Sequence, residues 1–162
     1  MLCFLNMIYD IIYTALADGR IVKIQNNKIV KLARLTKETT CGSYEMEPKC
    51  GRPLGLRRYN KDEFLIADAY LGLFLVNIEE GTSRRLIASK NPIDGVVPKF
   101  FNDIDFVDDD IFITDSSYKY ERRDFMSEML EGTGNGRVIR YRMSTGESST
   151  ILNNLKFPNG IQ

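Results

Sequence analysis

The chain has 162 residues, of which 43% are hydrophobic and 27% are charged, enough for one soluble domain with a buried core. The 22 Lys and Arg residues balance the 22 Asp and Glu residues, which argues against a nucleic-acid partner, because such surfaces need a basic excess. The paired arginines, such as Arg57-Arg58, are dispersed and are read as solvated strand edges or turns. The sequence contains no histidine, which excludes histidine-based triads and metal ligands within this chain.

The first thirteen residues are apolar but are interrupted by Asn6 and Asp10. They have no basic leading segment and are too short to span a bilayer, so neither a signal peptide nor a transmembrane segment is predicted. We expect this stretch to form a buried first strand.

Short apolar runs rich in Ile, Val, Phe and Tyr follow, separated by Gly, Asp and Asn turns, which is typical of β-strands. They form three similar units of three strands each, and a glycine opens the middle strand of each unit. A unit of this length is a propeller blade or a β-meander. The predicted strands are 11–15, 18–24 and 29–33, then 64–68, 72–77 and 84–88, then 111–115, 135–141 and 149–152.

Cys41 and Cys50 flank a polar loop that contains turn-forming residues. They can close this loop as a disulfide in an oxidising compartment, or remain free thiols in the cytosol, and the sequence leaves both open. CxxC spacing is absent, so no zinc site is expected.

Three motifs each open a further strand-like segment: the glycine-containing stretch 51–55, Phe101-Asn102-Asp103-Ile104, and Phe157-Pro158-Asn159-Gly160. In a propeller, such segment starts converge on the central axis, where polar side chains can form a site. The alternative is that Asn102 and Asn159 are turn formers whose side chains bond their own backbone.

One helix is predicted, in the insertion 118–132, with Phe125, Met129 and Leu130 on one face and Gly132 at its end. It would cover one blade, either as a packing element or as a lid over a pocket.

These motifs give the chain a resemblance to the strictosidine synthase-like family, and in particular to its animal branch. The resemblance implies an all-β fold of the six-bladed β-propeller family. About three blades would lie in residues 1–162, with one short helical insertion and with the C-terminal half missing, and residues 102–162 would form the conserved region of the family. The resemblance runs from about Tyr13 onward, through Asp18-Gly19-Arg20, Gly51-Arg52-Pro53, Ala67-Asp68-Ala69-Tyr70, Asn102-Asp103, Thr114-Asp115-Ser116 and Pro158-Asn159-Gly160.

The resemblance also implies kinship with calcium-dependent lactonases and arylesterases, in which Asn, Asp and Glu oxygens hold a calcium ion at the axis. Asn102 and Asn159 match the two family asparagines at that site. Asp103, Asp115 and Arg52 are further candidates for lining the axis. Ser116, beside Asp115, could also line the axis. For Asp103, Asp115 and Ser116 the alternative is a turn cap, and for Arg52 it is a bond to a neighbouring blade. The family's first-blade acidic motif is not found here and its other acidic residues lie in later blades, so no catalytic residue is assigned.

The leading expectation is therefore a calcium-assisted, arylesterase-like hydrolase of small-molecule esters or lactones, impaired in this chain. One alternative is a non-catalytic propeller scaffold, membrane-associated or secreted. Another is an amine–aldehyde lyase of the strictosidine synthase type. The resemblance places the protein in the secretory pathway, on the lumenal or extracellular side of a membrane.

Overall fold

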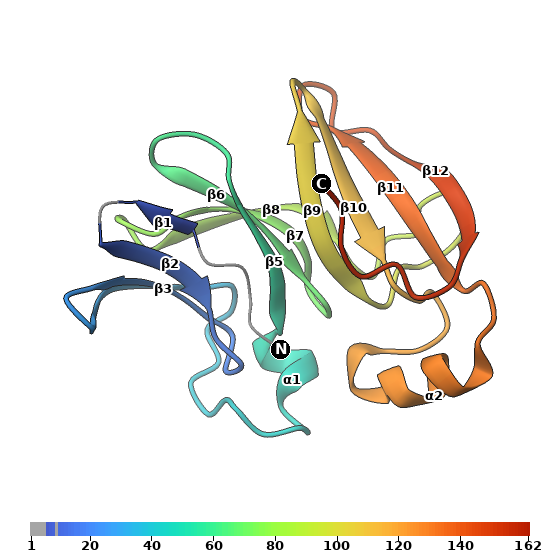
Figure 1. Ribbon diagram of the computed structural model, residues 1–162, viewed down its shortest axis with the longest axis horizontal. Coiled ribbons are helices and arrows are strands. Elements are labelled where there is room, and N and C mark those ends of the chain that lie inside the picture. Colours follow the sequence, from blue (N-terminus) through green and yellow to red (C-terminus); the bar gives the residue numbers. More distant parts are fainter. Residues whose placement is uncertain (1–5, 9) are drawn as a thin grey trace.

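The computed structural model describes residues 6–8 and 10–162, and within them the chain is a partial β-propeller. Twelve strands form three antiparallel sheets of four strands each, and the three sheets follow one another along the chain (Figure 1). In each sheet the strands pair in sequence order, so each sheet is a β-meander and corresponds to one blade.

The three predicted units are confirmed as the outer three strands of the sheets, and each sheet has one further strand at its inner edge. Residues 1–5 and 9 of the predicted N-terminal strand lie outside the described residues. The first sheet contains β1 (Asn6–Ile8), β2 (Ile11–Ala15), β3 (Arg20–Gln25) and β4 (Lys28–Arg34). The second contains β5 (Pro53–Arg58), β6 (Glu63–Asp68), β7 (Gly72–Asn77) and β8 (Thr82–Ala88). The third contains β9 (Phe101–Val107), β10 (Asp110–Asp115), β11 (Gly136–Arg142) and β12 (Ser148–Leu155).

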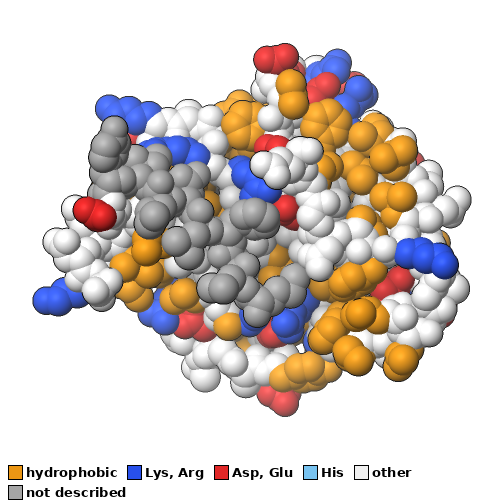
Figure 2. Space-filling model, viewed as in Figure 1, with side chains coloured by type: hydrophobic (Ala, Val, Ile, Leu, Met, Phe, Trp, Pro, Cys, Tyr) orange, Lys and Arg blue, Asp and Glu red, His pale blue; other side chains and the backbone are white. Residues whose placement is uncertain are grey.

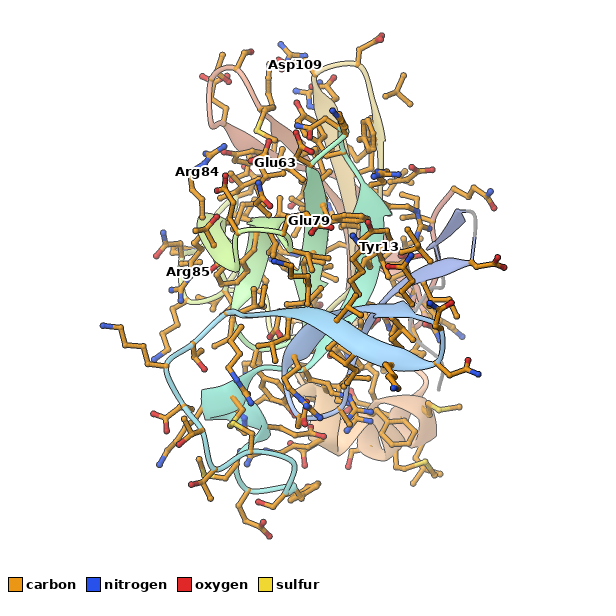
Figure 3. All side chains as sticks on the ribbon, turned by 90° about the vertical axis from the view of Figure 1, so that its left-hand side faces the viewer. Tyr13, Glu63, Glu79, Arg84, Arg85 and Asp109 are labelled. Carbon is orange, nitrogen blue, oxygen red and sulfur yellow. A yellow bond between two sulfur atoms is a disulfide. The ribbon has the colours of Figure 1, made fainter. Side chains whose placement is uncertain are left out.

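The core consists of two apolar layers, one between each pair of neighbouring sheets. The second sheet lies between the other two and is buried on both faces. Successive side chains of a strand point to opposite sides of its sheet. Phe64 and Ile66 of β6 therefore pack toward the first sheet, whereas Leu65 and Ala67 pack toward the third. Tyr13 of β2 and Glu79, in the turn after β7, lie at the junction of the first two sheets (Figure 3).

The predicted helix is confirmed in position: a 3-10 turn, η1 (Arg122–Asp124), leads into α2 (Phe125–Glu131). Gly132 ends α2 with a left-handed backbone, as expected. The predicted apolar face is wrong, however, because Met129 and Leu130 are 56% and 83% exposed while Glu128 is buried. The hydroxyl of Ser117 and the amide of Asn135 both donate hydrogen bonds to the Glu128 carboxylate, which compensates its burial.

The loop between the first two sheets contains a disulfide between Cys41 and Cys50 and a short helix, α1 (Glu47–Cys50), which the sequence did not predict. The Glu47 carboxylate accepts hydrogen bonds from Arg122 at 2.8 Å and from the Tyr70 hydroxyl at 2.8 Å. The loop is thus tied to the second sheet and to the helical insertion. No helix in residues 6–8 and 10–162 combines the length and the apolar character needed to cross a membrane.

Candidate functional site

Strand β5 lies directly against β9 at the inner edges of the second and third sheets. The contact is close because position 55 is a glycine: a Cβ atom there would lie 2.9 Å from the Cα atom of Asp103. The close approach places the polar residues at the start of β9 beside β5.

Asn102, the second residue of β9, is 3% exposed, and its side-chain amide has a defined orientation. The Nδ2 atom donates to the Ser116 hydroxyl at 2.8 Å, and that hydroxyl donates to the carbonyl of Pro158 at 2.7 Å. The carbonyl of Pro158 can only accept, so the single hydroxyl proton of Ser116 is directed to it. Ser116 is therefore the acceptor toward Asn102, and the Asn102 atom that faces it is the nitrogen. The Oδ1 atom of Asn102 therefore faces away from Ser116, and it accepts no hydrogen bond from the described residues.

Residues 157–161 are held against β9, beside which the C-terminus lies (Figure 1). The Oδ2 atom of Asp103 accepts hydrogen bonds from the backbone N–H of Ile161 at 3.3 Å and from Arg57 at 3.2 Å. Arg57 also donates to the carbonyl of Ile161 at 3.2 Å. Asn159 lies between two anchored residues, Pro158 and Ile161, and is itself exposed.

The oxygens gathered here are of the kind that a calcium ion prefers, because amide carbonyls are neutral, hard donors. A calcium ion takes six to eight such ligands. In the part of the chain that the structure describes, no group of three or more Asp, Glu, Cys or His side chains could hold a metal. The chain therefore fits one part of such a site, and the assignment of Asn102 and Asn159 as ligands stays a prediction.

Asp115 lies at the end of β10, opposite Arg137 of β11, and forms a buried ion pair with it. The Arg137 Nε atom lies 2.9 Å from Asp115 Oδ2, and the backbone N–H of Phe100 donates to Oδ1. Burial raises the pKa of Asp115 to about 6, although the Arg137 guanidinium acts in the opposite direction. These contacts give Asp115 a role in joining β10, β11 and the segment before β9.

Arg52 lies just before β5, and its guanidinium donates to the carbonyl of Ala17, in the turn between β2 and β3 of the first sheet, at 3.3 Å. It also lies 3.8 Å from the Glu47 carboxylate. Of the two expectations for Arg52, these contacts match the bond to a neighbouring blade.

Two contributions to the site were not identified from the sequence. Arg57 was read as a solvated arginine, yet its side chain is only 18% exposed and links β5 to Asp103 and Ile161. Ser116 was weighed only as an axis-lining or turn-capping residue, and its bridge from Asn102 to Pro158 depends on a contact between segments far apart in the sequence. The only sequence signal was its place within the Thr114-Asp115-Ser116 motif.

A model of the strictosidine synthase family matches residues 102–162. Over 155 residues, or 94% of its length, the chain is 44% identical to adipocyte plasma membrane-associated protein from Salmo salar and 41% identical to the Homo sapiens protein. The chain spans 37% of the length of each of these relatives. It is also 38% identical over 160 residues to the protein STRICTOSIDINE SYNTHASE-LIKE 3 from Arabidopsis thaliana, covering 92% of this chain and 40% of that protein.

Among solved structures, the computationally designed Ika4 protein is similar with a TM-score of 0.58 and 10% identity, covering 100% of this chain and 79% of that one. PorZ, a surface component of the type-IX secretion system of Porphyromonas gingivalis, is similar with a TM-score of 0.55 and 13% identity. That match covers 93% of this chain and 19% of PorZ. At these identities the likeness concerns the fold alone.

Proposed function

Because this chain belongs to the strictosidine synthase-like family, we propose that it forms part of a calcium-assisted hydrolase of small esters or lactones. In this proposal the chain supplies neutral oxygen ligands from the start of β9 and from residues 157–161. Its activity is low, because the described residues do not gather the carboxylates that would complete the site.

The observation that carries this proposal is the fixed orientation of the Asn102 amide. A turn-forming asparagine would bond its own backbone, whereas Asn102 Nδ2 is bonded to the side chain of Ser116, just after β10. One of the two amide N–H groups is thus bonded, and the amide oxygen accepts no hydrogen bond from the described residues. Such an arrangement suits a cation ligand, because an asparagine coordinates a cation through its amide oxygen. The hydrogen bond from the amide nitrogen keeps the amide from flipping.

A calcium ion bound there would polarise the carbonyl of an ester or lactone and stabilise the developing oxyanion. Other residues of the chain would hold the two asparagine ligands in place. Ser116 holds the Asn102 amide, and Asp103 together with Arg57 holds the segment that contains Asn159.

The test is the hydrolysis of phenyl acetate by the chain, in calcium and in excess chelator, compared with the Asn102→Ala variant. We expect turnover above the spontaneous rate that is lost in chelator and in Asn102→Ala. Asn153→Ala serves as the matched control because Asn153 is an exposed asparagine on β12. Turnover that survives both chelator and Asn102→Ala would contradict the proposal.

A second candidate, a membrane-associated or secreted scaffold, is supported by the names of the vertebrate relatives, which are called plasma membrane-associated. The disulfide between Cys41 and Cys50 supports a secretory location for either function. A well-folded chain without any calcium-dependent turnover would favour the scaffold.

A further inference from the structure

A groove with a positively charged lining lies beside α2 and is separate from the Asn102 site. Its volume is about 430 Å³. The floor is formed by Ala69 and Tyr70, after β6, and three lysines line it: Lys49, Lys90 and Lys99. One carboxylate, that of Glu121, also lines the groove.

The charge of this groove is not compensated by its own carboxylate. Glu121 pairs with Arg123 at 3.0 Å. Lys49, Lys90 and Lys99 form no ion pair with any described residue, and Lys99 donates to a backbone carbonyl, that of Lys119. The groove therefore presents three exposed lysines, which suits a ligand with negative charge.

The helix beside the groove turns apolar side chains outward. Met126, Met129 and Leu130 are 54%, 56% and 83% exposed, and orange side chains gather over the region of α2 in Figure 2. Removing these exposed apolar side chains from water would be favourable. They are exposed because α2 is seated through Phe125 and Glu128 instead.

The groove and the helix form one surface. Phe125 of α2 packs on a cluster that includes Ala69 and Tyr70, the same residues that floor the groove. The second link is Lys119, whose carbonyl accepts from Lys99 and whose ammonium group pairs with Glu131 at the end of α2. We call the three lysines together with Met126, Met129 and Leu130 the α2 surface.

From this pairing of charge and apolar side chains, we propose that the α2 surface docks on an anionic lipid bilayer. The lysines of the groove receive lipid phosphates, and the side chains of α2 enter the boundary between headgroups and acyl chains. Charge complementarity selects the bilayer: a soluble anion would use the groove but leave the α2 side chains in water, whereas a lipid surface uses both. This inference does not depend on the Asn102 site.

The test is flotation of the full 162-residue chain with vesicles of phosphatidylcholine alone or mixed with phosphatidylserine. We expect binding to the mixed vesicles only, and weaker binding as salt is raised. The variant Lys49→Gln with Lys90→Gln should bind about 30-fold more weakly, since each lysine near an anionic surface contributes about a fivefold change. Leu130→Glu should also lose binding.

Two controls match these variants in chemistry and exposure. Lys28→Gln with Lys61→Gln removes the same charge from exposed positions in β4 and in the turn after β5. Val107→Glu changes an apolar residue at the end of β9 that is 64% exposed. Both should bind like the wild-type chain. The proposal is overturned if the mixed vesicles are not bound, if neutral vesicles are bound equally well, or if the control variants lose as much binding as the variants of the α2 surface.

Discussion

Arg137 donates its Nε–H to Asp115 at 2.9 Å, and both side chains are almost completely buried. The same guanidinium donates to the carbonyls of Ile93 and Val96, so one arginine fixes the segment that leads into β9. The start of β9 carries Asn102, and the geometry of the candidate site therefore depends on a buried ion pair outside it.

Asp115→Asn should destabilise the fold strongly, because it leaves the buried Arg137 cation without its counter-charge. The expected loss in the free energy of unfolding is about 3–5 kcal/mol. Urea denaturation followed by circular dichroism measures it. Asp110→Asn is the control: its partner Arg142 is 41% exposed, solvent screens that pair, and the loss of stability should be much smaller. Equal losses in the free energy of unfolding for the two variants would show that the buried Asp115 pair stabilises the fold no more than the Asp110 pair does.

Asp68 should make stability depend on pH. Burial raises its pKa to about 6 from an ordinary value of 3.8. Between these two values the folded chain keeps a proton that the unfolded chain has lost, so this carboxyl lowers stability as the pH rises toward 6, and its effect is constant above that.

Asp68→Asn cannot titrate, yet it keeps an oxygen for the N–H groups of Tyr70 and Leu71. The stability of this variant relative to wild type should rise by on the order of 2 kcal/mol from about pH 4 to about pH 7. Denaturation across that range measures the difference, whatever constant offset the amide introduces. A difference that does not change with pH would show that Asp68 titrates normally.

Ser116→Ala should loosen residues 157–161 and free the Asn102 amide to rotate. The buried Nδ2 atom then lacks its acceptor, which costs about 1–3 kcal/mol. Hydrogen exchange of the Ile161 amide, bonded to Asp103 in the wild-type chain, should become faster. Ser144→Ala removes a serine hydroxyl from an exposed contact with Asp109 and is the matched control. Unchanged exchange at Ile161 in Ser116→Ala would show that the bridge does not anchor the segment.

Reducing the disulfide should destabilise the loop and the contacts that it supports. Restricting this short unfolded loop contributes about 2–3 kcal/mol, and Glu47 of α1 also holds Arg122 and Tyr70. The double variant Cys41→Ser with Cys50→Ser should therefore unfold at lower urea concentration. Reductant should lower the midpoint of the wild-type chain but not that of the double variant. A midpoint insensitive to reductant in both would contradict this prediction.

The sheets could be predicted from the sequence because their middle strands are runs such as Phe64–Ala67, buried on both faces and rich in β-forming residues. The inner strand β9 was found only at its start, since Asn102, Asp103 and Asp105 weaken the strand pattern. The helix was located by the spacing of Phe125, Met129 and Leu130 and by the glycine at its end. Its buried face was missed because periodicity assigns apolar residues to the core, whereas Ser117 and Asn135 hold Glu128 there.

The candidate site was predicted by residue type and not by geometry. The motifs named Asn102 and Asn159, but the bridge through Ser116 and the anchor through Arg57 join segments 14 to 104 residues apart. No local pattern reports such contacts. The ion pair of Asp115 is likewise visible only once β10 and β11 are placed in register.

The most direct test of the central claim, that Asn102 presents its amide oxygen to a cation, is the thermal unfolding of the chain in calcium and in excess chelator. Saturating calcium should raise the melting temperature of the wild-type chain and of Asn153→Ala by about 3 °C or more, and should leave Asn102→Ala unchanged. A melting temperature that calcium does not raise in the wild type, or raises equally in Asn102→Ala, would contradict the assignment of Asn102 as a ligand.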